Sequence, residues 1–132
     1  MRERLNKEID AFFAREISFP IMQDRYIFGF QEMVNLNKAH TIMLVQEGII
    51  DRESAKKILL GLDDMRKSFK LEDLDPKQEE LYFCFEQNLL DRIGREAGGK
   101  MHTGRSRNDI WACMTRMITR KSIWDVLEEV LK

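Results

Sequence analysis

Apolar residues recur every three or four positions along most of this chain, and that spacing constrains the fold more than any other feature. The stripe Ile58, Leu62, Met65 and Phe69 shows it most clearly, because residues three and four apart lie on one face of an α-helix. No run alternates apolar and polar residues as a half-buried strand does, and no two-residue hairpin signal occurs. The sequence therefore predicts an all-α fold.

Proline and glycine divide the first half of this helical pattern. We expect a short amphipathic helix over residues 1–15, followed by a break at residues 17–20, because the residue before Pro20 is pushed out of helical geometry. Pro20 then suits the first turn of a longer helix that runs over residues 21–47. Gly48 is a natural C-terminal stop for that helix.

Capping residues mark the helices that follow. Asp51 is expected to cap a helix that ends near Lys70. Asp75-Pro76 combines a capping carboxylate with a proline in the first turn, so it predicts the start of another helix that continues to about Ala97.

The last predicted helix is capped by Asn108 or Asp109 and is still amphipathic where the sequence stops. Trp111 and Trp124 lie on it, with no later helix to cover them. We expect its apolar face to need a partner, either further sequence or another chain.

Composition limits the class of protein. The chain has 132 residues, with 22 basic and 23 acidic ones and a formal net charge of −1, so it has no general attraction to nucleic acid or to an anionic membrane. No apolar run approaches the length of a membrane span, and no apolar signal segment follows the charged start. Cys84 and Cys113 favour small buried thiols over a disulfide or metal pair. We therefore expect a cytoplasmic protein.

Residues 98–109 are unlike the rest of the chain, since they combine three glycines, three cations, a histidine and small polar side chains. Arg105 and Arg107 are two positions apart, and in an extended loop they would flank a small anion such as a carboxylate. The start of the next helix adds free N–H groups. The alternative is a solvated basic loop with a capping Asn-Asp pair. A phosphate-binding P-loop is excluded by the missing G-x-x-x-x-G-K-[ST] motif.

The run His102-Thr103-Gly104-Arg105-Ser106-Arg107-Asn108-Asp109, preceded by Gly98-Gly99-Lys100, resembles the signature loop of argininosuccinate lyase, a family of the fumarase/aspartase superfamily. Residues 39–50 and 89–94 resemble that family more weakly. The similarity covers most of the chain, as the N-terminal portion of a longer enzyme.

The resemblance implies a fold and a domain division. Residues 1–107 would form the all-α N-terminal helical domain of the fumarase/aspartase-type lyase fold, with its signature loop at 98–107. Residues 108–132 would begin the central helix-bundle domain, which is truncated here. Members of the family are homotetramers whose active sites combine loops of three subunits.

The resemblance also implies a reaction, which is β-elimination of argininosuccinate to arginine and fumarate without cofactor or metal. Thr103, Ser106, Arg107 and Asn108 match positions that contact the dicarboxylate substrate, while Arg105 ties the loop to a neighbouring helix. No catalytic residue is assigned within this chain. The general base is expected downstream of Lys132, so the chain alone is predicted to be inactive.

Three departures leave the substrate open. Glu16 stands where the family has a substrate-binding serine, Tyr82 where it has a histidine, and Ile110 where it has a glutamine. A divergent lyase acting on another amino-dicarboxylate adduct is one alternative. A small all-α anion-binding or interaction module is the other.

Three further features are interpreted as structural. His40 lies among apolar residues and is expected to be a packed core histidine. The pairs Asp63-Asp64 and Glu79-Glu80 are adjacent in sequence, point to different sides of a helix and are expected to be solvated.

Overall fold

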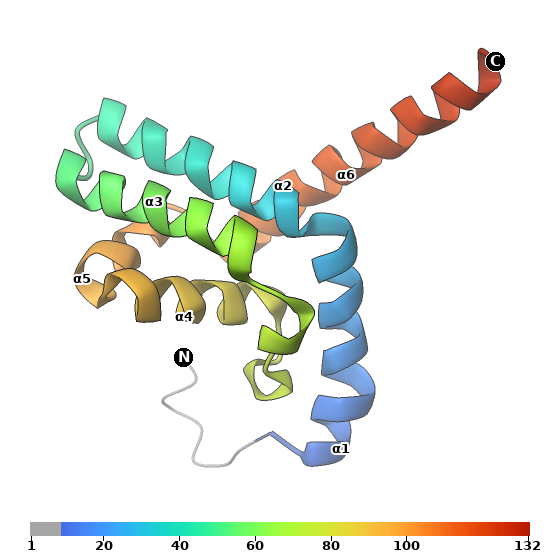
Figure 1. Cartoon of the computed structure of the whole chain (residues 1–132), viewed down its shortest axis with the longest axis horizontal. Coiled ribbons are helices and arrows are strands. Elements are labelled where there is room, and N and C mark those ends of the chain that lie inside the picture. The colour runs from blue at the N-terminus through green and yellow to red at the C-terminus, as the bar shows by residue number, and fades with distance from the viewer. Residues whose placement is uncertain (1–8) are drawn as a thin grey trace.

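The computed structural model describes residues 9–132, which are helical and contain no strand (Figure 1), so the predicted all-α class is confirmed. The elements in chain order are α1 (Ala11–Phe13), the π-helical turn η2 (Ala14–Ser18), α2 (Phe19–Gln46), α3 (Arg52–Ser68), the 3-10 turns η3 (Leu71–Asp73) and η4 (Pro76–Gln78), α4 (Leu81–Ile93), α5 (Arg95–Gly98), the 3-10 turn η5 (Gly99–His102), and α6 (Arg107–Val130). No helix within these residues is both long and apolar enough to cross a membrane.

The core lies where α2, α3 and α4 pack together (Figure 1). Helix α3 contributes the predicted stripe, since Ile58, Leu62 and Met65 are fully buried and Phe69 is nearly so. Phe30 of α2 stacks on Phe69 with ring centroids 5.2 Å apart. The helical spacing in the sequence therefore identified the buried face of α3 correctly.

The stop and cap of the α2–α3 hairpin are confirmed. Gly48 has a φ of 68°, a left-handed conformation that a side chain disfavours. The Asp51 carboxylate accepts the Ser54 N–H at 2.7 Å, which satisfies a free donor in the first turn of α3.

The predicted break at residues 17–20 is wrong. Asp10 caps α1, and the chain continues through η2 directly into α2. The Phe19 N–H bonds the Ala14 carbonyl, five residues back, which is π-helical geometry. Pro20 lies in the first turn of α2, and its missing N–H is tolerated where the hydrogen-bond register changes. The first part of the helix predicted over residues 1–15 lies outside the described residues.

The helix predicted from Asp75-Pro76 to Ala97 is too long at both ends. Asp75 does cap a turn, accepting the Lys77 N–H at 3.0 Å, but that turn is only η4. Glu79 then has a φ of 64°, which interrupts the helix, and α4 begins at Leu81. At the other end Gly94 has a φ of 83° and ends α4 at Ile93.

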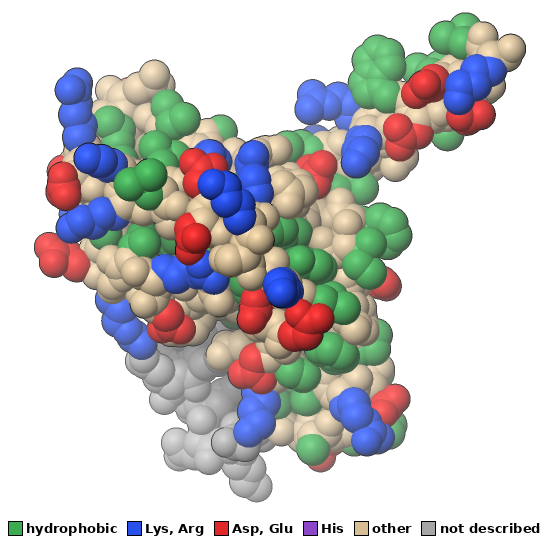
Figure 2. Space-filling view, in the orientation of Figure 1, with side chains coloured by type: hydrophobic (Ala, Val, Ile, Leu, Met, Phe, Trp, Pro, Cys, Tyr) green, Lys and Arg blue, Asp and Glu red, His purple; other side chains and the backbone are tan. Residues whose placement is uncertain are grey.

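Helix α6 crosses α2 and then extends away from the body (Figure 1). The crossing is close because Gly29 of α2 has no side chain, and a Cβ there would lie 2.7 Å from Met114 Cε. Beyond the crossing Trp124, Leu127 and Leu131 are exposed, and Figure 2 shows apolar side chains along this protruding half. As predicted, residues 9–132 leave this apolar surface uncovered, whereas Trp111 is packed against the core.

Two leucines of α3 test the core. We expect Leu62→Ala to lower the free energy of unfolding by about 2–5 kcal/mol, because Leu62 is fully buried and truncation leaves a cavity. Leu60→Ala is the matched control, since Leu60 is 60% exposed on the same helix, and should change stability by about 0.5 kcal/mol or less. Urea unfolding followed by circular dichroism measures both, and equal losses would contradict the assignment.

Candidate functional site

The candidate site is the connection between α5 and α6. It was expected to be an open loop over residues 98–107, but α5 and η5 extend helical geometry to His102, so only residues 103–106 are irregular. Gly104 has a φ of 75°, which makes the tight turn in this short stretch. The expected cap at Asn108 or Asp109 is also wrong, because Ser106 is the N-cap and Asp109 accepts the Ser106 N–H at 2.7 Å.

Lys100 fixes the start of the connection to α3. Its Nζ lies 2.7 Å from Asp51 Oδ2 and 2.9 Å from Ser54 Oγ. The hydrogen bond from Lys100, together with those from Ser54, holds the pKa of the Asp51 carboxyl well below its usual range. The same carboxylate thus caps α3 and anchors the loop.

Arg105 fixes the middle of the connection to α2. Its guanidinium donates to Oδ1 of Asn37, which is fully buried, and to the Met101 carbonyl at 3.3 Å. Burial lowers the pKa of Arg105, although an arginine remains charged at any ordinary pH. This confirms the prediction that Arg105 ties the loop to a neighbouring helix. It also means that Arg105 and Arg107 do not flank one anion from the same side, because Arg105 is directed inward.

His40 is the second attachment to α2, and its expected role was wrong. The side chain is only partly buried, and its Nε2 lies 2.9 Å from the Thr103 carbonyl. It therefore acts as a loop contact rather than as a packed core histidine. Burial lowers the pKa of His40, and the nearby charges of Arg105 and His102 lower it further, while the bond to Thr103 opposes them.

A third attachment joins the loop to α4. The Tyr82 hydroxyl lies 2.6 Å from Nδ1 of His102, and Tyr82 is fully buried while His102 is partly exposed. Burial raises the pKa of Tyr82, and the Glu86 carboxylate adds to this, so the phenol stays protonated. Helices α2, α3 and α4 therefore each hold one part of the loop.

The four predicted substrate-binding residues lie on the outer side of this anchored loop. Thr103, Ser106, Arg107 and Asn108 are all exposed. Within residues 9–132, the side chains of Thr103 and Asn108 make no hydrogen bond to the protein. The N–H groups of the first turn of α6 point to the same end of the helix, where its dipole is positive.

Arg107 differs from the other three because it already has an anionic partner. Its Nη1 lies 2.7 Å from Glu80 Oε2, and its guanidinium lies 5.2 Å from the Phe83 ring centroid. Half of the Arg107 side chain is still exposed. It can therefore keep Glu80 on one edge and present another edge to a ligand.

The expectation that the Glu79-Glu80 pair is solvated is wrong for Glu80. Its side chain is only 13% exposed and accepts a hydrogen bond from the indole of Trp111. Arg25 completes the cluster, 3.7 Å from Glu80 Oε1 and 4.1 Å from the Trp111 ring centroid. Sequence reasoning missed this cluster because its members come from three helices that are distant in sequence.

The carboxylates of the other acidic pair also have partners. Asp63 lies 2.5 Å from Lys38 Nζ, and Asp64 pairs with Arg92. The Asp64 carboxylate is largely exposed and that of Asp63 about half exposed, so both reach the solvated surface as expected.

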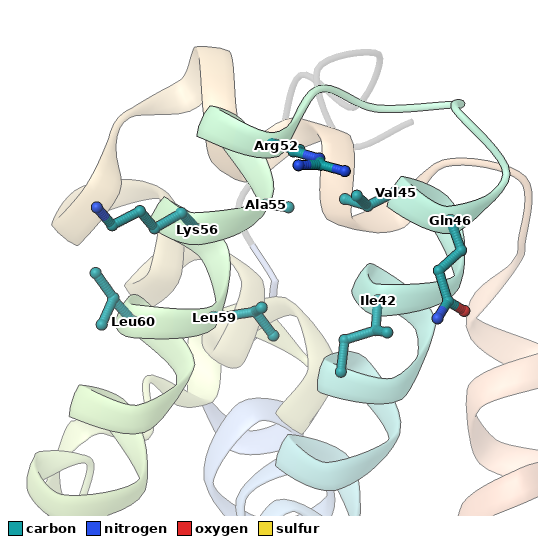
Figure 3. Close-up of a pocket in the computed structure, with 8 residues that line it drawn as sticks. All are labelled: Ile42, Val45, Gln46, Arg52, Ala55, Lys56, Leu59 and Leu60. Atoms are coloured by element: carbon teal, nitrogen blue, oxygen red, sulfur yellow. The ribbon is translucent and has the colours of Figure 1, made fainter.

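Pockets elsewhere do not involve the loop's outer residues. One of about 370 Å³ lies between α2 and α3, lined by apolar side chains such as Ile42 and Leu59 with Arg52 and Lys56 at its edge (Figure 3). It offers few polar groups to orient a dicarboxylate. Among the described residues no group of three or more His, Cys, Asp or Glu side chains is arranged to hold a metal ion. Neither Cys84 nor Cys113 forms a disulfide within the described part of the chain.

The fold is all-α, and its polar loop lies at the start of the long helix α6. A protein-family model described as "Lyase" matches residues 13–132, and the chain belongs to this family. The chain is 43% identical to argininosuccinate lyase of Methanosarcina barkeri over 107 residues, which is 81% of this chain and 21% of that enzyme. It is 35% identical to argininosuccinate lyase of Methanocaldococcus jannaschii over 127 residues, or 96% of this chain and 25% of that enzyme.

Argininosuccinate lyase of Methanothermobacter thermautotrophicus is 39% identical over 119 residues, which is 89% of this chain and 25% of that enzyme. The chain therefore spans about a fifth to a quarter of the length of these relatives. These matches confirm the resemblance read from the loop and agree with the N-terminal helical part of the fumarase/aspartase-type fold. The roles of the individual loop residues remain predictions.

The His40 contact predicts a pH dependence of stability. The pKa of His40 is lower in the folded chain than the value of about 6.5 in the unfolded one, so the unfolded chain binds more protons. The free energy of unfolding should therefore fall as pH drops from 7.5 to 5.5. His40→Gln retains an N–H donor for Thr103 but does not titrate, so its stability should fall less over this range. Urea unfolding at several pH values measures both, and equal slopes would refute the prediction.

Proposed function

We propose that this chain supplies the dicarboxylate-binding loop of an argininosuccinate-lyase-type enzyme. That enzyme cleaves the C–N bond of argininosuccinate by β-elimination and releases arginine and fumarate. The observation that carries the proposal is the arrangement of Thr103, Ser106, Arg107 and Asn108, which are exposed on an anchored loop at the positive end of a 24-residue helix.

The reaction explains why such donors are needed. Removal of the proton next to a carboxylate pushes negative charge onto that carboxylate, so donors placed there stabilise the transition state more than the substrate. The Asn108 amide is free to donate, and Arg107 is held in place by Glu80. The anchors from α2, α3 and α4 reduce the cost of ordering the loop when the substrate binds.

Proton abstraction is assigned to residues outside these 132. We propose that the general base comes from further sequence of the lyase and that the uncovered face of α6 packs in a helix bundle of a homotetramer. The proposed reaction uses neither cofactor nor metal. We propose the cytoplasm as its location, the compartment expected from the sequence.

A divergent substrate is the second candidate. Glu16 is exposed on η2, Tyr82 is buried against His102, and Ile110 is buried at the start of α6. None of these side chains is the residue type that the resemblance expects at its position. Another amino-dicarboxylate adduct would fit these departures, and a small anion-binding module would keep the loop without the reaction.

Ligand binding tests the loop directly. We expect succinate and fumarate to bind weakly, with a Kd on the order of millimolar, because this chain provides only part of a site. Asn108→Ala and Arg107→Ala should each weaken binding by about tenfold, the value of one hydrogen bond to a charged group. Chemical shift changes in a titration of the ¹⁵N-labelled chain measure the affinity.

Matched controls are available on the same chain. Asn88→Ala on α4 and Arg120→Ala on α6 change the same residue types outside the loop and should leave the affinity unchanged. Binding that is insensitive to Asn108 and Arg107, but present, would assign the anion to another surface and reject the proposed role of the loop.

Catalysis is expected to be absent from the isolated chain. We predict no fumarate release from argininosuccinate above the uncatalysed rate, because the proton-abstracting base is not among these residues. Fumarate absorbance measures this. Turnover by the purified chain that Asn108→Ala abolishes would show that the base lies within the 132 residues.

A further inference from the structure

The contact between Tyr82 and His102 determines more than the position of the loop. The hydroxyl lies 2.6 Å from Nδ1, and the two rings have centroids 5.3 Å apart at 47°. A neutral imidazole has one protonated and one unprotonated nitrogen, so the partner of one nitrogen decides the state of the other.

The surroundings of the phenol favour Tyr82 as the donor. Burial raises the pKa of the Tyr82 phenol, so the phenol keeps its proton, and the nearby Arg105 guanidinium can only donate and offers that proton no acceptor. The phenol proton is then free to point at Nδ1 of His102. The competing acceptor is the Glu86 carboxylate, which also lies near Tyr82.

The opposite nitrogen of His102 is unoccupied. Within the described residues, Nε2 of His102 has no hydrogen-bond partner. The buried side-chain atoms that lack a partner are Arg66 Nε and Arg105 Nε, so Nε2 of His102 is not a buried atom. It is therefore open to solvent. His102 directly precedes Thr103, and the Thr103 carbonyl is hydrogen-bonded to His40.

We propose that Tyr82 holds His102 as the Nε2–H tautomer and that this N–H is a further donor to a carboxylate oxygen of the bound dicarboxylate. His102 is thus a ligand-binding residue of the loop and Tyr82 is its positioning residue. The inference rests on the proposed function, because the ligand is the same dicarboxylate.

The tautomer is measured on the free chain. Long-range ¹H–¹⁵N spectra of the imidazoles at pH 8 report which nitrogen carries the proton, and His40→Gln assigns the two histidines. We expect His102 to be protonated at Nε2. Tyr82→Phe should shift it toward a mixture of tautomers, whereas Tyr26→Phe should not. Tyr26 is the matched control because its hydroxyl bonds the Phe69 carbonyl at 3.0 Å, away from the loop. A proton on Nδ1, with Tyr82 donating to Glu86, would overturn the proposal.

The binding role is measured with succinate as the probe. His102→Asn keeps a group near Nδ1 but removes the Nε2 donor, so it should weaken binding by about threefold to tenfold. His102→Gln places an amide N–H near Nε2 and should retain most of the affinity. Tyr82→Phe should weaken binding, and Tyr26→Phe should not. Wild-type affinity in His102→Asn overturns the role of His102.

The two proposals fail in different ways. If Asn108→Ala weakens binding while His102→Asn does not, the dicarboxylate loop stands and the role of His102 falls. If the wild-type chain binds neither succinate nor fumarate, the proposed function and the binding role fall together. The tautomer measurement still decides the role of Tyr82 in that case.

Discussion

The bond between Arg105 and Asn37 is the interaction on which the loop depends. It places a charged guanidinium against a fully buried amide of α2. Asn37 is itself fixed, since its amide donates to the Met33 carbonyl at 2.8 Å within the same helix. An unpaired guanidinium or amide at this depth would be costly, so the contact between the two groups favours this position of the loop. The position of residues 103–106 follows from this requirement.

The anchors and the exposed residues alternate along the loop. Lys100, His102 and Arg105 are directed toward α3, α4 and α2, while Thr103, Ser106 and Asn108 remain exposed. In this arrangement the charged side chains fix the backbone, and small neutral donors remain available to a ligand. Short side chains lose little entropy when they bind, so a loop of this kind is well suited to holding a small anion.

The sequence predicted what depends on local pattern. The stripe of α3, the cap at Asp51 and the stop at Gly48 are each determined within a few residues, and all are confirmed. The prediction of a break before Pro20 failed because the π-helical turn Ala14–Ser18 carries the helix on into α2. We identified no signature of that turn in the sequence. The start of α4 failed because Glu79, which is not a glycine, adopts a positive φ.

The same difference between local and long-range features applies to the site. The eight-residue run located the loop, and the inward role of Arg105 was predicted correctly. The loop roles of His40 and Glu80 were missed because their partners come from other elements. Thr103 lies 63 positions from His40, and Arg107 lies 27 positions from Glu80. No local pattern reports such contacts.

The pairing of Arg107 with Glu80 bears on how the loop selects its ligand. Arg107 and Arg25 share the single Glu80 carboxylate, so the cluster keeps a net positive charge, and the exposed half of Arg107 adds N–H groups that can donate to a second anion. For the proposed dicarboxylate ligand, binding would also depend on geometry, because its oxygens would have to accept from Arg107, Asn108 and the first turn of α6 together. Such a requirement would favour the shape of one dicarboxylate over other anions, which is the positioning that the proposed elimination needs.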